Sequence, residues 1–114
     1  MAVVSPVPVP VKEPGLEGLD GELIQAVLFV KNSSRARRVL EYLALRGRAA
    51  TKPLLRTVLG RESKKNHALL NELMALGLIK RYSGHNEDGH FVVWNEITPL
   101  GRLVLEIIES MKEG

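Results

Sequence analysis

The side chains best suited to recognition chemistry stand together at positions 63–67. This short run begins a helix with apolar patterning, so its side chains would project from a helix N-terminus. Lysine can donate to guanine, and asparagine can bind adenine in a bidentate manner. A helix N-terminus also favours phosphate. The run therefore predicts contacts with nucleic-acid bases for Ser63, Lys64, Lys65, Asn66 and His67.

A larger set of cations surrounds this run. Between Lys31 and Arg81 the sequence has thirteen Lys or Arg residues and three acidic residues, a formal charge of +10, whereas the rest of the chain carries −7. A basic middle between acidic ends is typical of a surface that faces phosphate. The alternative is an ordinary solvated helix surface rich in arginine. The predicted phosphate contacts are Arg35, Arg38, Arg48, Lys52, Arg56, Arg61, Lys80 and Arg81.

Apolar spacing and capping residues predict the helices that must position these side chains. Asp20 and Ser63 are suitable N-caps, and Thr51 or Lys52 would cap a short helix between them. A short helix, a turn with Gly60 and a second, capped helix predict a helix-turn-helix over about residues 51–76. The four helices expected in this part of the chain cover about 20–31, 35–46, 51–59 and 63–76.

Two strands follow the helix-turn-helix. Residues 78–82 and 91–97 are rich in apolar and aromatic side chains, and the polar loop between them contains two glycines, so residues 78–97 are predicted to form a hairpin. Residues 48–50 could hold a further short strand. Trp94 is expected to pack within the hairpin, with stacking on unpaired bases as the alternative.

A final helix closes the chain. Thr98 is a suitable N-cap and Pro99 favours the first helical position, so a helix is expected over residues 99–112. The predicted fold class is mainly α with a small β-hairpin, α+β overall, in one domain of residues 19–114. The preceding residues 1–18 alternate Val and Pro and are expected to form an extended tail.

This order of elements resembles the winged helix-turn-helix regulators of the broad MarR, ArsR and PadR group, which is common in bacteria and archaea. Three segments carry the resemblance over residues 35–101. They are the run LLNELMALGLIKR (69–81), the hairpin with a polar, glycine-bearing tip, and ITPLGR (97–102) at the entry to the last helix.

The resemblance implies a dimeric DNA-binding fold with flanking N- and C-terminal helices. Helix 63–76 would be the recognition helix in the major groove, and the hairpin 78–97 would be the wing on the adjacent backbone or minor groove. The tip of this wing departs from the family pattern. Wings that bind DNA usually carry Arg or Lys at the tip, whereas this one has Glu87 and Asp88, which phosphate would repel.

The first and last helices carry more apolar surface than one small core can bury. In the family, such flanking helices pair across a two-fold axis. The alternative is a monomer in which they pack only on their own domain. The residues predicted to form the dimer interface are Ile24, Leu28, Val104, Ile108 and Met111.

We predict from these features a homodimeric transcriptional regulator that binds specific double-stranded DNA in the cytoplasm, at the nucleoid. The alternative is a winged-helix module that binds protein or RNA within a transcription, replication or ribosomal assembly, with a protein partner on the wing or the tail. The absence of cysteine argues against a disulfide scaffold or a zinc finger. We expect no catalytic residues, metal or cofactor, and no membrane partner, because no apolar run reaches the ~18 residues of a membrane span.

Overall fold

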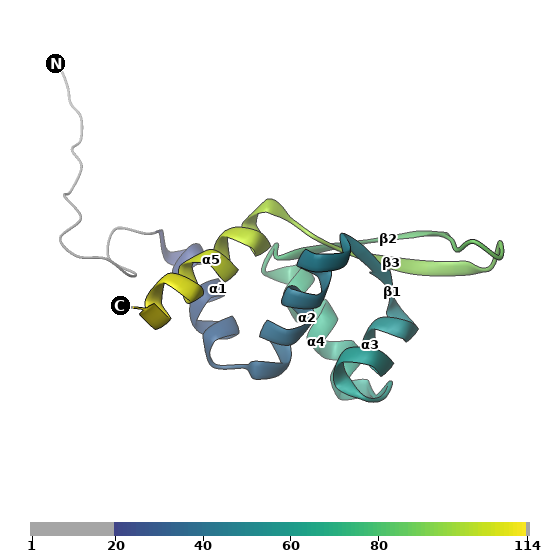
Figure 1. The fold of residues 1–114 in the computed structure, drawn as a ribbon, viewed down its shortest axis with the longest axis horizontal. Helices are drawn as coiled ribbons and strands as arrows, with labels where there is room; N and C mark the ends of the chain where they lie inside the picture. The colour runs from purple at the N-terminus through teal and green to yellow at the C-terminus, as the bar shows by residue number, and fades with distance from the viewer. Residues whose placement is uncertain (1–19, 114) are drawn as a thin grey trace, which may run out of the picture.

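Five helices and a three-stranded sheet build residues 20–113, the part of the chain that this computed structural model describes (Figure 1). The predicted tail of residues 1–18 lies outside this part. The arrangement is α+β and confirms the predicted fold class. The elements are α1 (Gly21–Lys31), α2 (Ser34–Arg46), β1 (Arg48–Ala50), α3 (Thr51–Leu59), α4 (Lys64–Ala75), β2 (Ile79–His85), β3 (Phe91–Ile97) and α5 (Pro99–Glu113).

Short polar side chains begin α1 and α4, as their sequences predict. The Asp20 carboxylate accepts from the Leu23 N–H at 2.8 Å, and the Ser63 hydroxyl accepts from the Asn66 N–H at 3.1 Å. Helix α3 differs, because its N-cap is Ala50, which has no side-chain acceptor. The prediction of Thr51 or Lys52 as the cap was therefore wrong.

One apolar core joins all five helices to the base of the sheet. Its members are leucine, valine and isoleucine side chains that are almost fully buried, including Val27, Val39, Leu40, Leu43, Leu54, Leu55, Leu70, Leu73, Ile79, Ile97 and Val104. Each such side chain stabilises the fold by roughly 1.5–3 kcal/mol relative to exposure. No helix within residues 20–113 combines the length and the apolar character needed to cross a membrane.

The sheet has the strand order β1-β3-β2, and both pairs are antiparallel. Strands β2 and β3 form the wing, which extends away from the helices (Figure 1). Strand β2 reaches His85, three residues beyond its predicted end, because the turn that follows is tight. The Asn86 side chain accepts from the N–H groups of Asp88 and His90, both at 2.9 Å, and Gly89 has a φ of +82°.

The base of the wing is closed by a contact between α5 and the chain that leaves α4. The Thr98 N–H donates to the Leu78 carbonyl at 3.0 Å, and the Thr98 hydroxyl donates to the Gly77 carbonyl at 2.7 Å. The same hydroxyl accepts from the Gly101 N–H at 3.0 Å. A Cβ at position 101 would collide with the Leu78 carbonyl oxygen and lie 2.7 Å from an Ile97 side-chain carbon. Only glycine fits there, which explains why the ITPLGR segment has a glycine at position 101.

Candidate nucleic-acid interface

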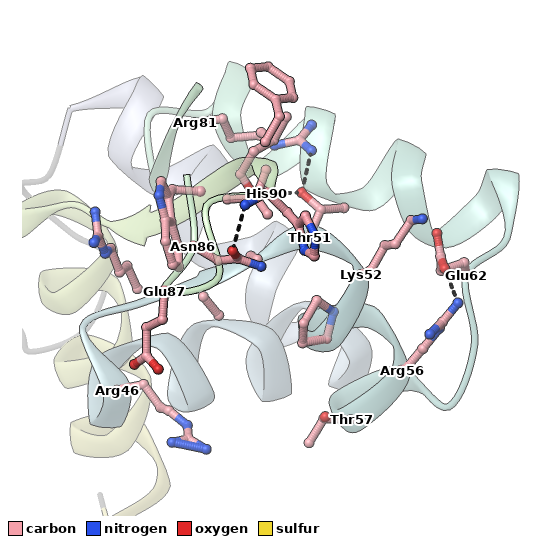
Figure 2. A pocket seen from close by; sticks show the side chains of 18 of the residues that line it. Arg46, Thr51, Lys52, Arg56, Thr57, Glu62, Arg81, Asn86, Glu87 and His90 are labelled. Atoms are coloured by element: carbon pink, nitrogen blue, oxygen red, sulfur yellow. Dashed lines mark hydrogen bonds and ion pairs between the residues drawn. The ribbon is translucent and has the colours of Figure 1, made fainter. Parts of the chain in front are cut away.

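A cleft of about 1200 Å³ opens between the wing and helix α3 (Figure 2). Its walls come from the end of α2, strand β1, the first turns of α3 and the outer half of the wing. Cations from four elements line it, namely Arg46, Arg48, Lys52, Arg56 and Arg81. Glu62, Glu87 and Asp88 also line it, so the cleft has a basic wall and an acidic wing tip.

Only some of the cations predicted to contact phosphate lie together in the cleft. Lys52 and Arg56 line the cleft from α3 (Figure 2). Arg48 lines it from β1. Arg38 is exposed on α2 and Arg61 is exposed in the turn before α4, but neither lines the cleft. Lys80 lies outside the cleft as well, with its ammonium 3.8 Å from the Glu96 carboxylate.

In the first turn of α4, some of the residues predicted to contact bases are exposed and others are not. Lys64 and Lys65 are exposed, whereas Ser63 is half-buried and uses its hydroxyl to cap the helix. His67 is half-buried at the cleft, with its Nε2 3.6 Å from Glu62. The same Glu62 carboxylate pairs with Arg56 at 2.8 Å. Glu62 thus holds a residue from each helix of the helix-turn-helix.

Asn66 does not face outward. Its side chain is 6% exposed, its amide donates to the Arg61 carbonyl at 3.0 Å, and its amide oxygen accepts from the Arg35 guanidinium. The prediction of a base contact by Asn66 was wrong, because the first helical turn has an inner side as well as an outer one. Through the same bond Arg35, a predicted phosphate contact, holds the first turn of α4.

Arg81 is also committed to the fold. Its three guanidinium nitrogens donate to Asn95 at 2.8 Å, to Asn71 at 2.7 Å and to the Thr51 hydroxyl at 3.1 Å. Burial lowers the pKa of Arg81 from its usual value, since desolvation disfavours the charged form. Arg81, a predicted phosphate contact, thus links β2, β3, α3 and α4, and it also lines the cleft.

Asn95 is a residue that the sequence interpretation missed. It is fully buried, and its amide donates to the Ala49 carbonyl at 3.1 Å and to the Thr51 hydroxyl at 3.0 Å while its oxygen accepts from Arg81. The alternation of side chains along β3 could have identified Asn95 as an inward-facing residue. Val93, Asn95 and Ile97 share one face of the strand, so the only polar member of that inward row needs partners.

Trp94, in β3, packs against residues of both neighbouring strands, β1 and β2. The Arg48 guanidinium stands 3.9 Å from the ring centroid. A Cβ added at Gly84 would lie 2.7 Å from the indole. These contacts agree with the packing role that we expected, and the ring also lines the cleft.

The wing tip is ordered by the Asn86 turn, and both of its acids line the cleft. Glu87 and Asp88 are exposed, and neither forms an ion pair with another described side chain. Phe91, the first residue of β3, is 67% exposed and meets the His85 ring edge-on at 6.0 Å. Within residues 20–113 no three His, Cys, Asp or Glu side chains are grouped so that they could hold a metal ion.

The predicted dimer interface is only partly available. Val104 and Ile108 are 0% and 3% exposed because they pack in their own core, so their assignment to a dimer interface was wrong. Ile24 and Met111 are half-buried, and Leu28 is 39% exposed. Leu103, which was not predicted, is 41% exposed on α5, the helix that packs beside α1 (Figure 1).

Three solved structures are similar to this chain. A MepR-like protein crystallised with pseudoligands has a TM-score of 0.60 and 20% identity over 78% of this chain and 61% of its own. A MarR-family transcriptional regulator from Silicibacter pomeroyi has a TM-score of 0.55 and 21% identity over 78% of this chain and 57% of its own. A possible transcriptional regulator from Methanosarcina mazei Go1 has a TM-score of 0.52 and 12% identity over 81% and 78%.

The chain spans about three fifths of the length of the first two proteins. No protein-family model and no curated protein matches the sequence. At identities of 12–21% these similarities establish the fold, and they agree with the element order of α1 to α5. The chain has the winged-helix fold found in MarR-family transcriptional regulators.

Proposed function

We propose that this protein binds specific double-stranded DNA as a homodimeric transcriptional regulator. The observation that carries the proposal is the cation-lined cleft between the wing and the helix-turn-helix, beside the exposed first turn of α4. A winged helix offers one helix for the major groove and a neighbouring surface for the backbone. Two of the three similar proteins are a MarR-family transcriptional regulator and a possible transcriptional regulator, which supports this reading of the fold.

Phosphate is the natural ligand of the α3 side of the cleft. Helix α3 has no side-chain cap and no acidic residue in its first turn, and Lys52 stands in that turn. The partial positive charge of the helix N-terminus and the Lys52 ammonium therefore act in the same direction. Arg56, one turn further on, is 65% exposed at its side chain although it pairs with Glu62. A DNA backbone in the cleft would meet both cations.

The first turn of α4 would read bases. Lys64 and Lys65 are exposed there with no acid in the turn, an arrangement that opposes the helix dipole unless an anion is bound. His67 is the third side chain on this side, and Glu62 restrains its ring. We propose that these three residues face the major groove, while Ser63 and Asn66 hold the turn in shape.

A dimer would place two such helices on adjacent half-sites, about 34–36 Å apart on B-DNA. We propose that its interface uses the exposed Leu28 and Leu103 together with the half-buried Ile24 and Met111. Replacing Leu28 and Leu103 together with glutamate should halve the mass measured by light scattering. The variant Leu45→Glu is the control, because Leu45 is 88% exposed on α2 and lies outside this set.

The first experiment is a titration of random-sequence duplex DNA across a salt series, with the mass measured on the same sample. We expect a steep fall in affinity with salt, about 0.9 log units per log unit of salt for each phosphate contacted. Lys65→Ala should weaken binding and reduce this slope, and Lys112→Ala, on the remote α5, should not. No binding at low salt would reject the proposal.

A protein-interaction module is the second candidate, and a specific observation favours it. The outer part of the wing exposes the Phe91 ring and two acids that form no ion pair within residues 20–113, a surface that suits a protein better than phosphate. This candidate predicts a stable protein complex that Phe91→Ala abolishes, in the absence of measurable affinity for duplex DNA. An RNA-binding module would instead prefer structured RNA in competition with the duplex.

A further inference from the structure

Two arginines near the base of the wing are held by aromatic side chains rather than by acids. The Arg46 guanidinium lies 5.2 Å from the Tyr42 ring centroid, and its Nε donates to the Tyr42 hydroxyl at 3.0 Å. Two residues further on, Arg48 lies 3.9 Å from the Trp94 ring centroid and donates to the Tyr82 hydroxyl at 3.2 Å. Both arginines line the cleft.

Neither guanidinium has an ionic partner among the described side chains. Glu96 stands opposite Arg48 in the β1–β3 register, but its carboxylate accepts from the Tyr82 hydroxyl at 2.8 Å and pairs with Lys80. Glu87 extends toward Arg46 from the wing without forming an ion pair (Figure 2). Within residues 20–113, neither arginine therefore forms a direct ion pair, although Glu87 lines the same cleft.

An arginine that is oriented in advance loses less side-chain entropy when it binds an oxyanion. The planar fork of a guanidinium matches two oxygens of a phosphate, and stacking on an aromatic ring fixes the plane of that fork. Arg46 and Arg48 meet these conditions, and they are exposed. Tyr42 and Trp94 would act as positioning residues, since they touch the arginines and not the ligand.

We propose that Arg46 and Arg48 form a clamp for the phosphodiester backbone of duplex DNA at the base of the wing. The clamp rests on the proposed function and adds a contact surface to it. Arg46 lies at one end of the cleft and Arg56 at the other (Figure 2), so the backbone would be held at both ends. The wing of this protein carries acids at its tip, and the clamp supplies from β1 and α2 the cations that the tip lacks.

The position of the two arginines suits a phosphodiester backbone better than an acidic peptide. The clamp shares one continuous cleft with Lys52 and Arg56, and the α3 N-terminus faces the same space. A row of cations along one cleft suits a polyanion with regularly spaced charges. An acidic protein surface is the competing partner, and the experiment separates the two.

The test compares salt slopes for random-sequence duplex DNA between the full-length chain and the double variant Arg46→Gln/Arg48→Gln. Loss of two phosphate contacts should reduce the slope by about 1.8 per protomer bound and weaken binding about 60-fold near 0.1 M salt. The matched control is Lys31→Gln/Lys112→Gln, which removes the same charge from α1 and α5, far from the wing (Figure 1). Its slope should stay close to that of the unmodified chain.

The variant Arg46→Lys/Arg48→Lys distinguishes an effect of lost charge from an effect of a disrupted fold. It keeps both charges, so it should restore most of the slope while binding several-fold more weakly than arginine. Trp94→Leu should weaken binding at an unchanged slope, because it frees Arg48 without removing its charge.

Each outcome decides a different claim. If the unmodified chain does not bind duplex DNA, the proposed function fails, and the clamp fails with it. If the unmodified chain binds but the glutamine variant matches its control, only the clamp is overturned and the arginines face another partner. A lysine variant that loses as much slope as the glutamine variant also overturns the clamp.

Discussion

Replacing Asn66 with alanine should destabilise the protein more than its place in an outer helical turn suggests. The Asn66 amide oxygen accepts from the Arg35 guanidinium, its nitrogen donates to the Arg61 carbonyl at 3.0 Å, and the side chain is 6% exposed. The substitution removes both hydrogen bonds, so the Arg35 guanidinium loses an acceptor and the Arg61 carbonyl loses a donor. The turn that precedes α4 would then lose its only side-chain link to α2 among the described hydrogen bonds.

The magnitude follows from the two lost bonds. A hydrogen bond to a charged group contributes about 1.5–3 kcal/mol and a neutral one about 1 kcal/mol. Water can reach Arg35 and Arg61 in part, so the lower end applies and the loss is about 2.5 kcal/mol. Alanine is the better helix former by about 0.5 kcal/mol, which leaves a net loss of about 2 kcal/mol.

Urea denaturation followed by circular dichroism measures this loss as a change in the free energy of unfolding. The midpoint of thermal unfolding should fall by about 10 °C. Glu72→Ala is the control on the same helix, because Glu72 is exposed and forms no described ion pair, and it should stay within about 0.5 kcal/mol. If Asn66→Ala costs no more than this control, the Asn66 bonds do not hold the turn and the reasoning is refuted.

Three further results are expected. Gly101→Ala should abolish the folded state at ordinary temperature, measured by circular dichroism, because its Cβ would overlap the Leu78 carbonyl oxygen; a folded variant would contradict the close approach. Ser63→Ala should lower the free energy of unfolding by about 1 kcal/mol in the same assay, through loss of the α4 cap. Glu87→Lys with Asp88→Lys should strengthen binding to random duplex DNA and steepen its salt slope; an unchanged titration would place the wing tip away from the DNA.

The helix ends were predictable because they depend on local chemistry. Asp20 and Ser63 cap helices in the way their side chains allow, and Thr98 followed by Pro99 begins α5 at the expected residue. A cap needs only atoms that lie three residues away along the chain, so the local sequence contains the whole interaction. The end of β2 was misplaced because the turn depends on the Asn86 side chain, whose bonds shortened the loop.

The partners of the buried polar groups were not predictable in this way. Arg35 meets Asn66 across 31 residues of sequence, and Arg81 meets Thr51 across 30. From charge and residue type alone, both arginines were predicted to contact phosphate at the surface. The burial of Val104 was not predictable either. The number of apolar residues in α5 indicates that the helix has two apolar faces, but it does not indicate which face packs on its own core.

The hydrogen bonds of Arg81 have a consequence for motion. One side chain joins both strands of the wing to α3 and α4, and Asn95 adds β1 to the same network. Bending the wing alone would break several of these bonds at once within a half-buried site. The hydrogen bonds of Arg81 therefore resist bending of the wing relative to α3 and α4. In the proposed dimer, a signal that changes the distance between the two α4 helices would move each wing together with its α3 and α4 and leave the shape of each cleft intact.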